Sequence, residues 1–252
     1  MKINLSYVGE EILDLFYPKS CIECGKPGKW ICDECLKKVR FLSSGFCKKC
    51  GKPLNKSTGL CPLCHDFQFS FTACRSAFVY EGAVASGIKA LKYSKRIPFA
   101  SYFAAFLYDI LVHEDWNIDL ITAVPLYKDR LAERGFNQSG KIAESLSKKV
   151  SIPYNSSALQ KISDTKTQVG LGREERLENL KSAFVAEPIF VIGKRILLID
   201  DVMTTGSTFN ECSQTLLKAG ASNVFCLSIA TSVPSDNDNW SFEKEYYKNL
   251  LR

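Results

Sequence analysis

One stretch, residues 196–208, constrains the fold of this chain more than any other. It opens with the unbroken apolar run Ile-Leu-Leu-Ile at 196–199, which is typical of a parallel strand buried on both faces. Two adjacent carboxylates, Asp200 and Asp201, follow at what we expect to be the exposed carboxyl end of the strand. A short polar loop comes next, and helical spacing of apolar residues begins near Gly206. This order predicts a strand–loop–helix unit of a parallel α/β sheet.

The loop after the acidic pair has the chemistry of a phosphate site. Backbone N–H groups at a helix start are unpaired and favour an anion. The hydroxyls of Thr204, Thr205, Ser207 and Thr208 add donors, and Gly206 allows the backbone to close around a phosphate. The loop contains no lysine, which excludes the nucleotide-binding P-loop. A phosphate on the loop and a diol on the carboxylates together describe a ribose 5-phosphate.

The stretch resembles the phosphoribosyl pyrophosphate (PRPP) motif of type I phosphoribosyltransferases. In that family the two acidic residues hold the ribose hydroxyls and the loop holds the 5-phosphate. The resemblance therefore implies a set of PRPP-binding residues, namely Asp200, Asp201, Thr204, Thr205, Gly206, Ser207 and Thr208. It assigns no catalytic residue.

The cysteines predict metal rather than disulfides. Eight of the eleven lie in four CxxC pairs, which are Cys21/Cys24, Cys32/Cys35, Cys47/Cys50 and Cys61/Cys64. Two thiolates with this spacing can converge on one tetrahedral zinc ion. The sequence Cys-Ile-Glu-Cys-Gly-Lys-Pro at 21–27 recurs as Cys-Lys-Lys-Cys-Gly-Lys-Pro at 47–53, so one structural Cys₄ site per repeat is the simplest assignment. A crossed pairing, first pair with third, stays open, and so do one or two Zn²⁺ ions.

The overall charge is weak support for a polyanionic partner. Eight thiolates and two Zn²⁺ would lower the formal net charge from +6 to about +2. Acidic residues interrupt the first twenty positions, which argues against a signal peptide. The most apolar segment, residues 99–112, contains Asp109 and is too short to span a bilayer. We therefore expect a cytoplasmic protein with no transmembrane segment.

Three parts are expected along the chain. Residues 1–71 hold an amphipathic helix (1–20) and the double CxxC module, residues 72–232 a phosphoribosyltransferase-like domain, and residues 233–252 a tail. Strands are expected at 76–80, 120–124, 183–186, 189–192, 195–200 and 223–230, and helices at 82–93, 98–113 and up to about residue 150. Strands alternating with helices predict a parallel α/β sheet with a small N-terminal zinc module.

Two basic segments could serve a pyrophosphate. Ligands bind beyond the carboxyl ends of parallel strands, where residues 125–138 carry Lys128, Arg130 and Arg134. Residues 158–181, polar and poor in apolar anchors, are expected to form a mobile flap that brings Lys161 and Arg176 over the ligand. Mg²⁺ is expected to accompany PRPP, because the leaving pyrophosphate is highly charged.

Nearly the whole chain resembles the ComF family of competence proteins. The resemblance rests on the CxxC pairs, the PRPP motif, Arg134-Gly-Phe-Asn-Gln138 and Asp164-Thr-Lys-Thr-Gln168. It implies a role in natural competence and DNA uptake. The protein would act on incoming single-stranded DNA at the cytoplasmic side, peripheral to the inner face of the membrane, with other proteins of the competence machinery.

Two functions of different class remain open from the sequence. The first is a Mg²⁺-dependent phosphoribosyltransferase of unknown acceptor, which the intact acidic pair and loop favour. The second is a nucleic-acid-handling protein with little or no turnover. It is favoured by Lys48, Lys49, Lys52 and Lys56 beside aromatic residues, a combination that can follow phosphates and stack bases.

We predict that removing the metal unfolds the N-terminal module, because structural zinc supplies much of the stability of so small a unit. Metal analysis of protein purified without chelator should give two zinc ions per chain. Absence of zinc would refute the metal assignment, and a ratio of one would refute one site per repeat.

Overall fold

The computed structural model describes residues 19–42, 45–54, 59–163 and 183–233. The predicted helix within residues 1–20, most of the predicted flap and nearly all of the predicted tail lie outside these ranges.

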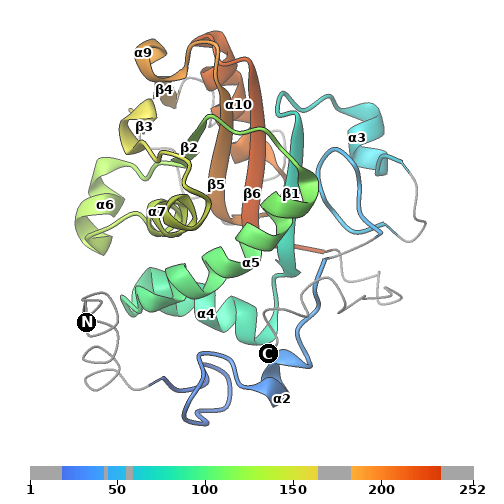
Figure 1. Ribbon diagram of the computed structural model, residues 1–252, viewed down its shortest axis with the longest axis vertical. Coiled ribbons are helices and arrows are strands. Elements are labelled where there is room, and N and C mark those ends of the chain that lie inside the picture. Colours follow the sequence, from blue (N-terminus) through green and yellow to red (C-terminus); the bar gives the residue numbers. More distant parts are fainter. Residues whose placement is uncertain (1–18, 43–44, 55–58, 164–182, 234–252) are drawn as a thin grey trace, which may run out of the picture.

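The centre of the fold is a parallel sheet of four strands in the order β1-β6-β5-β2. Its strands are β1 (Ala73–Val79), β2 (Leu120–Ala123), β5 (Arg195–Met203) and β6 (Asn223–Thr231). One face is covered by α5 (Pro98–Glu114) and α7 (Gln138–Val150), with α4 (Gly82–Tyr93) packed against α5, and the opposite face by α10 (Ser207–Lys218) (Figure 1). The predicted parallel α/β architecture is confirmed.

The apolar run of β5 supplies both cores, because side chains alternate along a strand. Leu197 and Ile199 pack into the core beneath α5 and α7. Ile196 and Leu198 pack into the core beneath α10. All four side chains are fully buried, so the continuous apolar run is explained by a strand with no solvent face.

Both edge strands are covered by backbone from elsewhere in the chain. On β1, Leu42 N donates to Ala77 O at 2.9 Å and Cys74 N donates to Lys49 O at 2.8 Å. On β2, Ile121 N donates to Pro153 O at 2.9 Å. Unpaired edges invite pairing with other chains. The cysteine-rich segment thus closes one side of the sheet.

Other elements lie around this sheet. The cysteine-rich segment contains α2 (Asp33–Leu36) and α3 (Pro62–Asp66), and α6 (Lys128–Arg134) follows β2. The 3₁₀ turn η1 (Ser156–Ala158) leads into β3 (Leu159–Lys161), which pairs antiparallel with β4 (Phe184–Ala186) in a separate small sheet, followed by α9 (Pro188–Val191). No helix among the described residues combines the length and apolar character needed to cross a membrane.

The segment 183–192 differs from the sequence prediction in two ways. The strand expected at 189–192 is wrong, since Pro188 opens the short helix α9 over that run. Proline suits the first turn of a helix, where its missing N–H costs nothing. The strand expected at 183–186 exists as β4, but it belongs to the small antiparallel sheet.

Arg75 on β1 ties the cysteine-rich segment to the sheet. Its Nε donates to Glu114 at 2.6 Å, its Nη1 donates to Lys48 O at 2.9 Å, and its guanidinium lies 4.8 Å from the Phe46 ring centroid. The side chains of Arg75 and Glu114 are only 11% and 18% exposed.

Arg75→Met is predicted to lower the free energy of unfolding by about 3 kcal/mol, because it leaves Glu114 largely buried without its partner. Urea denaturation measures the change. Lys29→Met is the control, since it breaks the exposed Lys29–Asp33 pair, and such pairs contribute about 0.2–1 kcal/mol. Equal effects of the two variants would contradict the prediction.

Candidate functional site

The acidic pair does not lie at an exposed strand end. Strand β5 continues through Asp200 and Asp201 to Met203, so the two carboxylates belong to the strand and their side chains diverge. Asp201 is 4% exposed. The expectation that both carboxylates lie open to solvent is therefore wrong for Asp201, because the strand ends at Met203, three residues beyond its predicted end at residue 200.

Asp201 is held by a lysine from α4. Lys92 Nζ lies 2.9 Å from both oxygens of the Asp201 carboxylate, donating a hydrogen bond to Oδ1 and meeting Oδ2 only as an ion-pair contact. Oδ2 is buried and accepts no hydrogen bond from the described residues. Burial opposes the charge of Lys92, but the charge of Asp201 and the hydrogen bond to it outweigh burial and raise the lysine pKa.

Asp200 faces the loop. It lines a small hollow together with Thr204, Gly206, Ser207 and Thr208. Its Oδ1 accepts hydrogen bonds from the Asp201 backbone N–H and from Ser139 Oγ, each at 2.8 Å. Burial, followed by the neighbouring charge of Asp201, raises the pKa of Asp200 to about 7. The Asp200 carboxyl is therefore the one that a ligand in the hollow would meet.

Residues 204–208, here called the phosphate loop, present the start of α10 to the same hollow. Gly206 precedes the helix with a φ of 82°, a left-handed conformation that glycine adopts without strain. Gly206, the N-cap residue, has no side chain with which to cap α10, and Thr205 Oγ1 accepts a hydrogen bond from Ser207 N. Within the loop, Thr205 and Ser207 hydroxyls are 2.9 Å apart, and Ser207 N lies 3.3 Å from Thr205 Oγ1. Free N–H groups at a helix start favour an anion, and phosphate binding at this loop stays a prediction.

The segment Arg134-Gly-Phe-Asn-Gln138 shapes the neighbouring helix start. Gly135 ends α6 in the left-handed conformation. Asn137 caps α7 by accepting from Ser139 N at 3.1 Å, and its Nδ2 donates to Val124 O at 2.9 Å, just past β2. The start of α7 is thereby fixed beside the strand ends, which places Ser139 against Asp200.

Sequence reasoning missed Ser139 and Lys92. Ser139 directly follows the segment that marked the site, and nothing in its own type singles it out. Lys92 carried a usable signal, because it lies four residues after the fully buried Ile88 on an apolar helix. Residues four apart share one helix face, so a lysine there must either bend outward or find a buried partner.

Three of the predicted pyrophosphate residues lie on α6 and one lies on β3. Arg134 donates to Gln138 Oε1 and lies 5.4 Å from the Tyr93 ring centroid. Lys128 and Arg130 are exposed on α6, and Lys161 on β3 lies 5.8 Å from the Phe184 ring centroid. Arg176 lies outside the described residues. Their role with a pyrophosphate stays a prediction.

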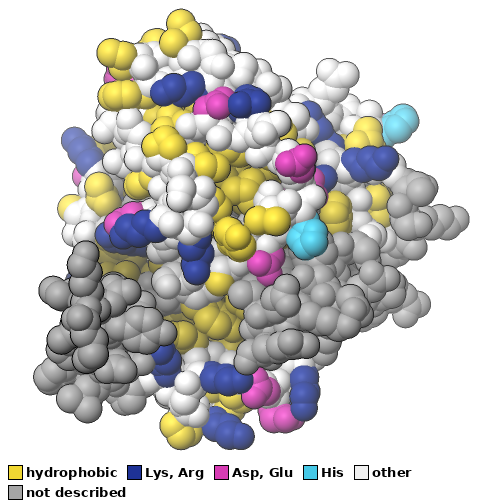
Figure 2. All heavy atoms as spheres, in the orientation of Figure 1, with side chains coloured by type: hydrophobic (Ala, Val, Ile, Leu, Met, Phe, Trp, Pro, Cys, Tyr) yellow, Lys and Arg dark blue, Asp and Glu magenta, His cyan; other side chains and the backbone are white. Residues whose placement is uncertain are grey.

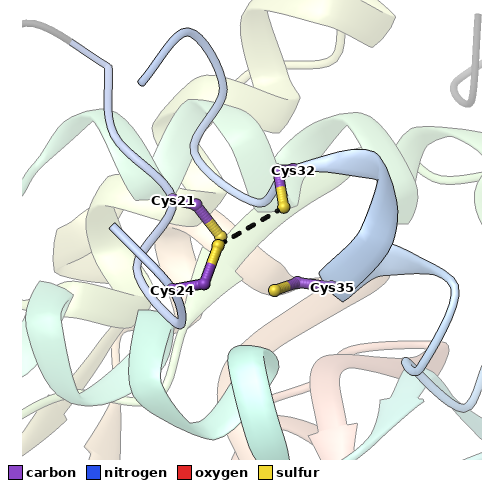
Figure 3. Close-up of side chains that lie close together, drawn as sticks. All are labelled: Cys21, Cys24, Cys32 and Cys35. Atoms are coloured by element: carbon purple, nitrogen blue, oxygen red, sulfur yellow. Dashed lines mark hydrogen bonds between the residues drawn. The ribbon is translucent and has the colours of Figure 1, made fainter. Parts of the chain in front are cut away.

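The eight paired cysteines form two separate clusters. Cys21, Cys24, Cys32 and Cys35 converge in one (Figure 3), and Cys47, Cys50, Cys61 and Cys64 converge in the other. Within each cluster the sulfur atoms all lie within 4.8 Å of one another. The Cys24–Cys32 and Cys50–Cys61 sulfur distances are both 3.6 Å, close to the edge of roughly 3.8 Å that Zn–S bonds of about 2.3 Å give a tetrahedron. The crossed pairing is wrong.

The two repeats also share their backbone geometry. Gly25 N donates to Cys21 O at 2.8 Å, and Gly51 N donates to Cys47 O at 2.9 Å. Both glycines have positive φ, as a turn around a metal-bound sulfur requires. His65 is exposed and stands outside both clusters. Four cysteines per site leave no open position, which indicates structural zinc.

Comparison with known proteins agrees with this picture. A double zinc ribbon domain model matches residues 12–67. The chain is 33% identical over 224 residues to the DNA utilization protein YhgH of Escherichia coli K12, covering 84% of this chain and 98% of that protein. The chain belongs to the ComF family. It is also 30% identical to competence protein F of Haemophilus influenzae, covering 85% of this chain and 98% of that protein. The chain is 29% identical to competence protein ComFC of Streptococcus pneumoniae, covering 79% of this chain and 86% of that protein.

Solved structures give a partial likeness. The Bacillus subtilis glutamine PRPP amidotransferase complexed with ADP and GMP matches with a TM-score of 0.37 and 21% identity over 52% of this chain, which spans only 26% of that protein. Adenine phosphoribosyltransferase of Thermoanaerobacter pseudethanolicus matches with a TM-score of 0.36 and 14% identity, covering 54% of this chain and 82% of that one.

The raised pKa of Asp200 gives a pH prediction. The group binds its proton more tightly in the folded chain, so ionisation costs stability as pH rises from about 4 to about 7. Asp200→Asn removes this cost while its amide oxygen can still accept both hydrogen bonds. The variant's thermal midpoint, relative to the unchanged protein, should therefore rise by a few degrees between pH 5 and pH 8, at about 2–4 °C per kcal/mol. A midpoint difference that stays constant over this range would contradict the assignment.

Proposed function

We propose that this ComF-family protein acts in DNA uptake and utilisation, binds PRPP or a related ribose 5-phosphate beside Asp200, and handles incoming single-stranded DNA at the cytoplasmic side. One observation carries the proposal. Asp200 and the start of α10 line the same hollow, in a chain whose relatives are named for competence and DNA utilization. We retain the division into residues 1–71, 72–232 and 233–252 as part of the proposal.

Each part of the hollow has a defined task in this proposal. The phosphate loop holds the 5-phosphate through N–H groups and hydroxyls. Asp200 accepts a ribose hydroxyl, and Ser139 fixes the carboxylate that does so. Lys92 pairs with the Asp201 carboxylate and holds it in place. Mg²⁺ bound with PRPP would neutralise pyrophosphate charge, in keeping with the oxygen ligands that this ion prefers.

Single-stranded DNA would be held mainly by charge. On the face drawn in Figure 2, Lys and Arg side chains are spread among acidic ones rather than gathered in one strip. On the second zinc ribbon Lys48 is exposed and Lys52 half-buried, whereas Lys49 lies 5.7 Å from the Phe71 ring centroid and burial lowers its pKa. These lysines offer few contacts to DNA phosphates, so we expect single-stranded DNA to bind weakly and without sequence preference.

The second candidate is a Mg²⁺-dependent phosphoribosyltransferase of unknown small-molecule acceptor. The Asp200 carboxyl in the hollow favours this candidate, because carboxyl groups with a raised pKa are common at catalytic sites. Pyrophosphate release from PRPP on addition of an acceptor would establish turnover. Binding of PRPP without release supports the first candidate.

Isothermal titration with PRPP–Mg²⁺ tests the ligand. Asp200→Asn is predicted to weaken binding tenfold or more, since a hydrogen bond to a charged group contributes about 1.5–3 kcal/mol. Asp119→Asn is the matched control, because Asp119 pairs with Arg195 at the opposite end of β5. No heat with the unchanged protein, or equal affinities of all three proteins, would refute the ribose phosphate site.

The same titration with a short single-stranded oligonucleotide tests the DNA partner. About three phosphate contacts predict a slope of log affinity against log salt of roughly −2. Lys48→Ala combined with Lys52→Ala should flatten this slope, whereas Asp200→Asn should not if the two ligands bind apart. A lack of binding even at low salt would remove DNA from the proposal and leave the transferase.

A further inference from the structure

The two zinc ribbons are alike in sequence but rest on different parts of the protein. The first cluster's Cys21, Cys32 and Cys35 belong to the core on the α5 and α7 face. All four cysteines of the second cluster belong to the core on the α10 face. That second core also contains Met203 and Phe209, which flank the phosphate loop and line its hollow.

A row of rings leads from the second cluster to the phosphate loop. Cys64 lies in α3, and Phe67 is the C-cap residue directly after that helix. Phe67 meets Phe69 edge-on with ring centroids 4.9 Å apart, and Phe69 stacks on Phe71 at 4.8 Å. A Cβ at Gly206 would lie 3.0 Å from Phe69 Cε1. The Phe69 ring therefore lies directly against the loop backbone, where only glycine leaves it room.

A hydrogen bond fixes the same segment to the helix behind the loop. Ser70 N donates to Asn210 Oδ1 at 2.8 Å, and Asn210 N in turn donates to Gly206 O at 2.9 Å. Phe69 and Asn210 are 4% and 2% exposed. Because Asn210 and Ser70 are 140 residues apart in the chain, this hydrogen bond fixes the position of the neighbouring Phe69 ring relative to the first turn of α10.

A second route from the same ribbon reaches the other side of Gly206. Gly51, which follows Cys50 of the second cluster, packs against the backbone of Cys74, where a Cβ would overlap the Cys74 carbonyl oxygen. Cys74 Sγ lies 3.9 Å from Met203 Sδ, and Met203 Cε would lie 3.4 Å from a Cβ at Gly206. Both neighbours of Gly206 thus rest on the second ribbon.

The first ribbon has no comparable contact among the described residues. Its Trp30 packs on Phe99 of α5, with ring centroids 5.2 Å apart, and its Glu23 accepts from Ser86 of α4 at 3.0 Å. These contacts place it on the helices at the far side of the sheet from α10 (Figure 1).

From these contacts we propose that the second zinc ribbon supports the phosphate loop of the ribose phosphate site from behind and that Phe69 is a positioning residue for that loop. This inference rests on the proposed function for the identity of the ligand. Zinc in the second cluster holds α3, α3 holds the row of rings, and Phe69 holds Gly206 in the conformation that turns the N–H groups of α10 toward the hollow. Zinc in the first cluster has no part in this.

The test uses the full chain with PRPP–Mg²⁺ as the probe and Phe69→Leu as the variant. Phe69→Leu should keep two zinc ions, lose about 10- to 100-fold in affinity because small displacements of a binding group have effects of that size, and speed amide exchange at residues 204–208. Phe69→Met keeps an adaptable apolar contact and should recover most of the affinity. Trp30→Leu, the matched loss of an aromatic anchor from the first ribbon, should change neither affinity nor loop exchange.

Cysteine variants complete the comparison. Cys64→Ser and Cys35→Ser should each reduce the zinc content from two to one, and only Cys64→Ser should speed exchange at the loop. Unchanged loop exchange in Phe69→Leu and Cys64→Ser, or the same increase in Trp30→Leu and Cys35→Ser, would overturn the inference. Amide exchange needs no ligand, so it decides the matter even if PRPP fails to bind the unchanged protein and the proposed function falls.

Discussion

The position of β5 between two cores is the constraint on which the rest of the structure depends. With β6 on one side and β2 on the other, and helices above and below, its side chains have no solvent to enter until the strand ends. Because the strand runs on to Met203, its two neighbouring carboxylates leave the backbone toward different surroundings. One meets Lys92 and is buried, and the other meets Ser139 and the hollow. A single strand thus separates a charge that supports the fold from a charge that can meet a ligand.

The zinc module is joined to this sheet by more than a linker. Its backbone covers the free edge of β1, Arg75 fastens it to α5 through Glu114, and each of its clusters enters a different core. A small unit with short helices buries too little apolar surface to be stable alone, and metal supplies what is missing. The zinc module in turn covers the β1 edge of the sheet.

Much of this could be predicted from the sequence, and the failures have physical causes. The apolar run at 196–199, the glycine before α10 and the repeated CxxC spacing each report a local requirement, so the parallel sheet, the strand–loop–helix unit and the paired cysteine clusters follow from them. The exposure of Asp201 could not be predicted in the same way, because it depends on how far β5 extends and on a lysine 109 residues earlier. The run at 189–192 is short enough to suit either a strand or a helical turn, and Pro188 decided for the helix. Phe69 and Asn210 show the same limit, since their roles come from long-range contacts, of Phe69 with Gly206 and of Asn210 with Ser70.

A glycine follows the first CxxC pair in each copy of the repeat, Gly25 in one and Gly51 in the other. These two glycines limit differently how far the copies can diverge in sequence. Gly25 has open space where a side chain would begin, so a substitution there meets only the resistance of its own backbone conformation. Gly51 has the same local geometry, but the backbone of β1 occupies the space that a side chain at this position would need. Two copies of one sequence pattern are therefore under unequal constraint. The first can drift toward asparagine or another residue that tolerates a left-handed turn, whereas the second is fixed by a neighbour that lies beyond the repeat itself.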